Sequence, residues 1–206
     1  MCFILATGKF TLDYIDILEN AWMSNNDGAG ISTHDGDKLV MMKPYTRFSH
    51  LRDSLRNLAG QPAVVHLRMA THGGVSGANT HPFWTCGKKA LLSHNGIMPM
   101  PWCGNRALSD SRQFAESLMN LDASDIYDGR DNIGKAIGHN KVVIMKEDGS
   151  IFVINKDFGY DLDKETWCSA NPSYMMGACY TKPANYISAG GYDDNKYNHL
   201  AKKQIQ

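Results

Sequence analysis

The second residue of the chain is a cysteine, and its place could make it a nucleophile. Removal of the initiator Met1 would leave Cys2 with a thiol and a free α-amine on one residue. An α-amine titrates at about pH 7.7–8.0 and a thiol at about 8.5, so the amine can serve as the base for its own thiol. This arrangement needs no separate histidine or aspartate. The alternative, and for Cys2 taken alone the commoner one, is a small residue buried in a first strand.

Polar residues that could bind a small substrate gather in four short strings farther along the chain. The strings are HLRMATHG (66–73), NTHPF (79–83), SHNGI (93–97) and SDS (109–111). Each string has an ordinary explanation when taken alone. Arg68 would be a solvated charge at a strand end, Asn95-Gly96 a hairpin turn, and Asp110 a carboxylate at a helix start. Their order behind an N-terminal cysteine favours a shared function.

Together with Cys2, these strings resemble the glutaminase domain of class II glutamine amidotransferases, which are N-terminal-nucleophile hydrolases. The family carries strings such as H-T-R-W-A-T-H-G, N-A-H-P, H-N-G-x-I and S-D-T/S in this order. Residues 27–31, DGAGI, also resemble its D-S-A-G-I segment, and the matches run from residue 2 to about residue 111. The resemblance implies an α+β fold, a four-layer α/β/β/α sandwich with two antiparallel sheets.

The resemblance also implies a reaction, the hydrolysis of the side-chain amide of L-glutamine to glutamate and ammonia, with Cys2 as the nucleophile. The oxyanion formed on attack needs donors about 3 Å away. These would be the Asn95 side-chain amide and the Gly96 backbone N–H. Arg68 would bind the substrate carboxylate through its planar guanidinium, and Asp110 would bind the ammonium. Further lining of the glutamine pocket is expected from Thr71, His72 and Gly73.

Two positions depart from the family's strings and keep alternatives open. Met69 stands where Trp is common, and Arg112 follows the SDS string where an acidic residue is common. Met69 could loosen the pocket and Arg112 could change its charge balance. An amidohydrolase of the same mechanism that acts on another γ-glutamyl or acyl amide is therefore one alternative. A non-catalytic interaction domain is another, because a retained Met1 would block the amine.

Four histidines, at positions 66, 72, 81 and 94, could suggest a metal site. They show neither HExxH nor HxH spacing, and no carboxylate lies between residues 54 and 109. We therefore expect no catalytic metal, and the proposed chemistry requires no organic cofactor. The glycine-rich segment 72–77 lacks the P-loop lysine and the G-x-G-x-x-G spacing. We expect it to form a lid over glutamine.

Composition narrows the partners and the compartment. The chain has 206 residues, with 21 Lys+Arg and 21 Asp+Glu, so its formal net charge is zero. A dedicated nucleic-acid or anionic-membrane binder is not expected at this balance. The five cysteines are never spaced as CxxC, which disfavours a thiolate zinc site and a disulfide framework. With neither a signal peptide nor a membrane span expected, we predict a cytoplasmic protein.

The length fits one domain. We expect a single glutaminase domain over residues 1–206, with residues 181–206 as a less certain tail. If that domain uses the whole chain, ammonia passes to a separate acceptor, such as a synthase subunit, or is released as a product.

Hydrophobic periodicity and turn residues predict the elements that would position these side chains. We expect strands at 2–6, 30–33, 38–43, 63–69, 91–94, 141–145 and 151–155. Helices are expected at 11–23, 48–58, 110–121 and 131–138. Residues 72–89 should form a long loop, and residues 167–171 a late core strand near the site.

Overall fold

The computed structural model describes residues 2–71, 73–102 and 104–171, which form two antiparallel sheets and five α-helices. The first sheet holds β1 (Phe3–Thr7), β2 (Ala29–His34), β3 (Leu39–Tyr45), β4 (Ala63–Leu67), β9 (Tyr160–Asp161) and β10 (Thr166–Cys168). The second holds β5 (Phe83–Thr85), β6 (Ala90–Asn95), β7 (Lys141–Lys146) and β8 (Ile151–Ile154). The helices are α1 (Tyr14–Trp22), α2 (Phe48–Arg56), α3 (Asp110–Ser117), α4 (Ala123–Asp128) and α5 (Arg130–Ile137).

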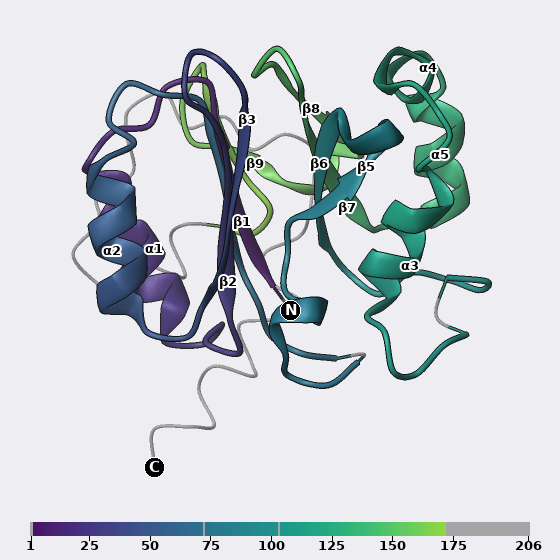
Figure 1. Cartoon of the computed structure of the whole chain (residues 1–206), viewed down its shortest axis with the longest axis horizontal. Helices are drawn as coiled ribbons and strands as arrows, with labels where there is room; N and C mark the ends of the chain where they lie inside the picture. The colour runs from purple at the N-terminus through teal and green to yellow at the C-terminus, as the bar shows by residue number, and fades with distance from the viewer. Residues whose placement is uncertain (1, 72, 103, 172–206) are drawn as a thin grey trace, which may run out of the picture.

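The two sheets lie face to face between two helical layers (Figure 1). The first sheet has the order β3-β2-β4-β1-β10-β9 and the second β5-β6-β7-β8. Helices α1 and α2 cover the outer face of the first sheet, and α3, α4 and α5 cover the outer face of the second (Figure 1). The expected α+β class and four-layer sandwich are confirmed.

Alternation along the strands builds this layering. In β1, Phe3 and Leu5 pack into the core under α1 and α2, whereas Ile4 and Ala6 face the second sheet. Val143 on β7 meets Ile4 in the layer between the sheets. Both faces of the central strands are covered, so their sequences are apolar at nearly every position. This is why β1 reads as a continuous apolar run.

Most expected elements are present, with ends shifted by a few residues. The prediction for residues 72–89 is wrong in part, because this segment contains β5 and the 3₁₀ turns Gly77–Asn79 and Cys86–Lys88. Strand β5 has only three residues, too few to show a period. Helix α4 and strand β9 were not predicted either, because both are too short to show a period. Helix α3 ends before residue 121, because Leu118 already leaves helical geometry.

Two expectations about the end of the chain have different outcomes. The late strand is present as β10, which pairs with β1 in the first sheet. The tail expected at 181–206 lies outside the described residues. No helix in the described part of the chain has the length and hydropathy that crossing a membrane requires.

Candidate active site

Cys2 and Arg68 lie side by side because β1 and β4 are antiparallel neighbours. Phe3, at the start of β1, pairs with Leu67, at the end of β4. Cys2, which precedes Phe3, and Arg68, which follows Leu67, therefore meet at the same end of the sheet. The Met69 backbone N–H donates a hydrogen bond to the Cys2 Sγ atom at 3.4 Å. This contact fixes the thiol against the end of β4.

The Cys2 thiol faces a narrow pocket that gathers most of the expected site residues. Its lining includes Cys2, Arg68, Thr71, Gly96 and Asp110, five of the eight residues expected from the sequence. Residues from both sheets and from the start of α3 thus meet at one place. The cavity volume is about 10 Å³, room for about one water molecule.

The remaining three expected residues are His72, Gly73 and Asn95. His72 falls outside the described residues. Gly73 does not line the pocket, but its carbonyl oxygen accepts a hydrogen bond from Arg68 Nη2 at 3.4 Å. Asn95 is also absent from the lining, and its Nδ2 donates to the Ser169 Oγ atom at 2.8 Å. Its Oδ1 is buried and has no hydrogen-bond partner within the described part of the chain.

Burial controls the protonation of the thiol. It raises the pKa of Cys2, and the Met69 N–H and the charge of Arg68 offset only part of that effect. The thiol is therefore protonated at neutral pH, and attack requires a base. His81 and His94 also line the pocket, but burial lowers the pKa of both rings. Neutral imidazoles with such low pKa values are weak bases for this thiol.

Arg68 is buried, with 2% of its surface exposed, and is held by the loop that follows β4. Its Nη1 donates to the Gly74 carbonyl oxygen at 3.2 Å, next to the contact with Gly73. Burial lowers the pKa of Arg68, and the nearby Cys2, Asp27 and Asp110 oppose this. A guanidinium stays charged even so. The site therefore presents one fixed positive charge beside the thiol.

Asp110 is the first residue of α3, and its carboxylate is fixed by backbone donors. Oδ2 accepts the Met98 N–H at 2.7 Å, and Oδ1 accepts the Ser111 N–H at 2.8 Å. Ser109 caps the helix as its spacing predicts, with its Oγ accepting the Arg112 N–H at 3.2 Å. The positive end of the helix dipole favours a carboxylate at this position. Asp110 thus supplies a preorganised negative charge in the pocket wall at the start of α3.

Gly96 occupies a position that requires glycine. Its φ is 144°, and a Cβ there would overlap the Asn140 Oδ1 atom. Asn140 is fixed in turn by His94, whose Nε2 lies 2.8 Å from that oxygen. The Asn95-Gly96 pair is not a hairpin turn, because the next strand along the chain, β7, begins only at Lys141. The hairpin alternative is therefore wrong, and the backbone at Gly96 borders the pocket.

Asn79 has a positioning role that the sequence reading did not assign. Its Oδ1 accepts the Ser109 N–H at 2.8 Å, and its Nδ2 donates to the carbonyls of Gly74 and Ala107 at 3.2 Å each. One buried side chain thus ties the loop that holds Arg68 to the start of α3. The only sign of this role in the sequence was the position of Asn79 at the start of the NTHPF string.

The histidines form a packed cluster beneath the pocket. The rings of His66 and His81 stack with centroids 3.8 Å apart, and His94 Nδ1 lies 2.7 Å from Ser111 Oγ. Among the described residues, no group of three or more His, Cys, Asp or Glu side chains is arranged to hold a metal ion. Arg112 points away, in an ion pair of 2.9 Å with Glu116, and does not line the pocket. An effect of Arg112 on the pocket's charge balance stays a prediction.

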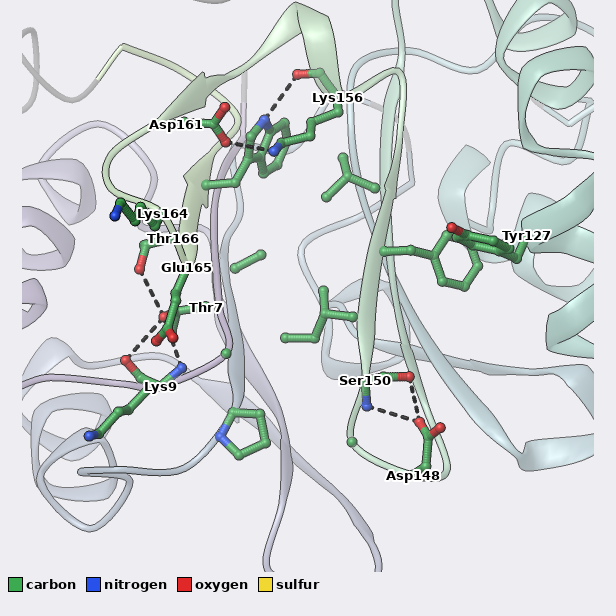
Figure 2. Close-up of a pocket in the computed structure, with 18 of the residues that line it drawn as sticks. Thr7, Lys9, Tyr127, Asp148, Ser150, Lys156, Asp161, Lys164, Glu165 and Thr166 are labelled. Carbon is green, nitrogen blue, oxygen red and sulfur yellow. Dashed lines mark hydrogen bonds and ion pairs between the residues drawn. The ribbon is translucent and has the colours of Figure 1, made fainter. Parts of the chain in front are cut away.

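A larger cavity, of about 880 Å³, opens between the sheets near the other end of β1 (Figure 2). Thr7, Trp167 and the ion pair of Lys156 with Asp161 are among its lining residues. Among the described residues, its lining contains no cysteine, histidine or arginine. Thr7 lies five residues along the chain from Cys2, at the other end of β1, a span of about 17 Å. Cys2 and its charged neighbours therefore belong to the smaller pocket.

Comparison with known proteins agrees with the motifs. The chain is 35% identical over 82 residues to glutamine–fructose-6-phosphate aminotransferase (isomerizing) of Streptococcus pyogenes serotype M6, covering 39% of this chain and 14% of that protein. The protein of the same name from Thermococcus kodakarensis is 36% identical over 74 residues, covering 35% of this chain and 12% of that protein. The matched regions thus span only about one-seventh of these relatives' length. No family model matches the chain.

The fold has a counterpart among solved structures. Glutamine phosphoribosylpyrophosphate amidotransferase from B. subtilis, complexed with ADP and GMP, superposes with a TM-score of 0.57. The match covers 81% of this chain and 40% of that one, at 16% sequence identity, so it is evidence about the fold. The resemblance to class II glutamine amidotransferases is confirmed by the sequence similarity over about 80 residues, and the structural match is consistent with it at the level of the fold.

Proposed function

We propose that this chain hydrolyses the side-chain amide of L-glutamine to glutamate and ammonia, with Cys2 as an N-terminal nucleophile. The observation that carries the proposal is the pocket that joins Cys2 to Arg68, Gly96 and Asp110. The side-chain amide of glutamine would lie at the thiol, its carboxylate at Arg68 and its ammonium at Asp110. A zwitterion needs charges of both signs, and the pocket supplies one of each.

The base in this proposal is the α-amine of Cys2, exposed by removal of Met1. Burial raises the pKa of the thiol and lowers the pKa values of His81 and His94, so the adjacent imidazoles are poorly suited to the role. An α-amine has an ordinary pKa of about 7.7–8.0 and is tethered to the thiol. It accepts the thiol proton, directly or through a water molecule, near neutral pH.

The reaction then has two halves. The Cys2 sulfur attacks the amide carbon, a C–S bond forms, and the carbonyl oxygen becomes an oxyanion. The Gly96 N–H and the Asn95 amide donate hydrogen bonds to that oxyanion. The C–N bond breaks, the α-ammonium returns its proton, and ammonia leaves a γ-glutamyl thioester. Water, deprotonated by the same amine, then attacks the thioester and releases glutamate and the free thiol.

The fate of the ammonia is part of the proposal. The sequence relatives are named as aminotransferases, and the matched segment covers at most 14% of the two compared here. We propose that residues 1–206 supply the glutaminase step alone. The ammonia is then released or passed to an acceptor site outside these residues.

The test compares glutamate release by the wild type with that by Cys2→Ala and Cys86→Ala. Intact mass must first establish that Met1 is removed. Cys86 is a buried thiol in the core between the second sheet and the helices α3, α4 and α5. It is therefore the matched control. We expect turnover by the wild type and Cys86→Ala and none by Cys2→Ala. Equal turnover by the wild type and Cys2→Ala would contradict the proposal.

Met69 favours testing a second substrate class. Met69 lines the pocket and is 38% exposed, so the pocket borders solvent at this residue. The alternative is an amidohydrolase of the same mechanism acting on a larger γ-glutamyl amide. Comparison of kcat/KM for glutamine and for γ-glutamyl alkylamides separates the two. Preference for an alkylamide would establish the alternative.

A further inference from the structure

Ser169 lies at the junction between the two sheets, immediately after β10. It is 2% exposed. Its backbone N–H donates to the Ile4 carbonyl oxygen at 2.9 Å, and its Oγ accepts the Ile4 N–H at 2.8 Å. Both contacts fix Ser169 to β1, two residues from Cys2. The same Oγ atom lies 2.8 Å from Nδ2 of Asn95, at the end of β6 in the second sheet.

The hydrogen bonds of this pair leave two groups unused. The Ser169 hydroxyl can donate as well as accept. Asn95 Oδ1 is buried and accepts no hydrogen bond from any described residue. Such an unpaired buried acceptor is destabilising. Meanwhile Nδ2, the group that an oxyanion would need, is turned toward Ser169.

A half-turn of the Asn95 amide about its last side-chain bond exchanges Oδ1 and Nδ2 with little change in shape. The Ser169 hydroxyl then donates to Oδ1, while its oxygen still accepts the Ile4 N–H. This arrangement satisfies the buried acceptor. It also turns Nδ2 away from Ser169 into the buried position that Oδ1 holds now, where its N–H groups have no partner among the described residues and are left for a ligand.

We propose that Ser169 is a positioning residue that orients the Asn95 amide for the glutaminase reaction. Its hydroxyl holds Oδ1 and thereby presents Nδ2 to the oxyanion. The Ile4 backbone fixes Ser169 to the strand that follows Cys2. The position of the Asn95 donor is thereby set relative to the nucleophile. This inference rests on the proposed function. Ser169 touches no reacting atom and acts through Asn95.

The first test is the kinetics of Ser169→Ala with glutamine. An oxyanion donor acts in the transition state, so kcat should fall about 10- to 100-fold while KM changes less than threefold. Ser169→Thr keeps the hydroxyl and should retain at least one-third of wild-type kcat. The control is Ser32→Ala, which removes a buried hydroxyl on β2 that has no partner within the described chain. It should leave kcat unchanged.

The second test asks whether Ser169 acts through Asn95. In an Asn95→Ala background, the further change Ser169→Ala should alter kcat less than twofold. If the two losses multiply, the inference is wrong. If Ser169→Ala does not fold, as judged by thermal unfolding, Ser169→Cys supplies a similar volume with a weaker hydrogen bond. It should lower kcat at least fivefold at unchanged KM.

The outcomes separate this inference from the proposed function. Turnover that requires Cys2 but has equal kcat in the wild type and Ser169→Ala overturns the role of Ser169 alone. A folded Ser169→Ala variant that raises KM with normal kcat also overturns it. Absence of glutaminase turnover in wild-type protein with Met1 removed overturns both.

Discussion

The Nη1 atom of Arg68 donates a hydrogen bond to the Gly74 carbonyl oxygen at 3.2 Å. The arginine that we propose binds the substrate carboxylate therefore also holds the loop that follows β4. An incoming carboxylate would compete for the same guanidinium.

Replacement of Arg68 should therefore affect binding most strongly. We expect Arg68→Ala to raise the KM for glutamine at least 30-fold, and Arg68→Lys to raise it less, because a lysine cannot bind a carboxylate with a planar fork. Steady-state kinetics measure both. Arg52→Ala, which removes an ion pair with Glu19 on the helical layer, is the control and should leave KM unchanged. An unchanged KM in Arg68→Ala would show that the carboxylate lies elsewhere.

Gly96→Ala should damage the site through overlap and not only through backbone strain. Gly87 also has positive φ, 62°, but a Cβ there meets nothing within 4 Å. Gly87→Ala should cost about 1 kcal/mol of unfolding free energy, the usual cost of left-handed geometry. Gly96→Ala should cost about 3 kcal/mol, because the new Cβ overlaps Asn140 Oδ1. Urea unfolding of the two variants gives this difference, and equal values would refute the overlap.

Asn79→Ala should loosen the connection between the loop and α3. The change removes three hydrogen bonds, at about 1 kcal/mol each, so unfolding free energy should fall by about 3 kcal/mol. Asn57→Ala removes one exposed contact and should cost less than about 0.5 kcal/mol. Hydrogen exchange of the Ser109 amide, which donates to Asn79 Oδ1, should accelerate in Asn79→Ala only. Unchanged exchange at Ser109 would contradict this role for Asn79.

The buried histidines predict a loss of stability in acid. Burial lowers the pKa of His66 from 6.5 to about 3, so the unfolded chain binds a proton there that the folded chain does not. The contribution of neutral His66 to the free energy of unfolding is fully present above pH 6.5 and is lost as the pH falls toward 3. In His66→Gln, unfolding free energy should fall less steeply between these limits, by up to about 1.4 kcal/mol per pH unit. Exposed His50→Gln is the control, and equal slopes in all three proteins would contradict the prediction.

Short-range patterns predicted most strands and helices, whereas the layers and most of the pocket followed from the family resemblance. Apolar runs marked the central strands because both of their faces are covered, and Ser109 marked the start of α3. Strand β5 was missed because three residues carry no period and its pairing with β6 is a tertiary effect. The motif order placed Cys2 and Arg68 together, and strand pairing does bring them together.

The structure differs from the sequence-based predictions where contacts between residues far apart in the sequence determine a side chain's partners. Ser169 lies 74 residues from Asn95, so nothing local in the sequence connects them. Arg112 follows the SDS string, and its helical position turns it toward Glu116. A neighbour in sequence on a helix is not a neighbour in space.

The most direct measurement is covalent labelling by a glutamine-like diazoketone, an electrophile that reacts with a nucleophilic thiol. Intact mass and peptide mapping of the labelled protein give the number and position of adducts. We predict one adduct, on Cys2 as the first residue of the processed chain, which excess glutamine slows and which Arg68→Ala reduces. Labelling of another cysteine at equal rate, or an unlabelled Cys2 in processed protein, would contradict the claim that Cys2 is the nucleophile.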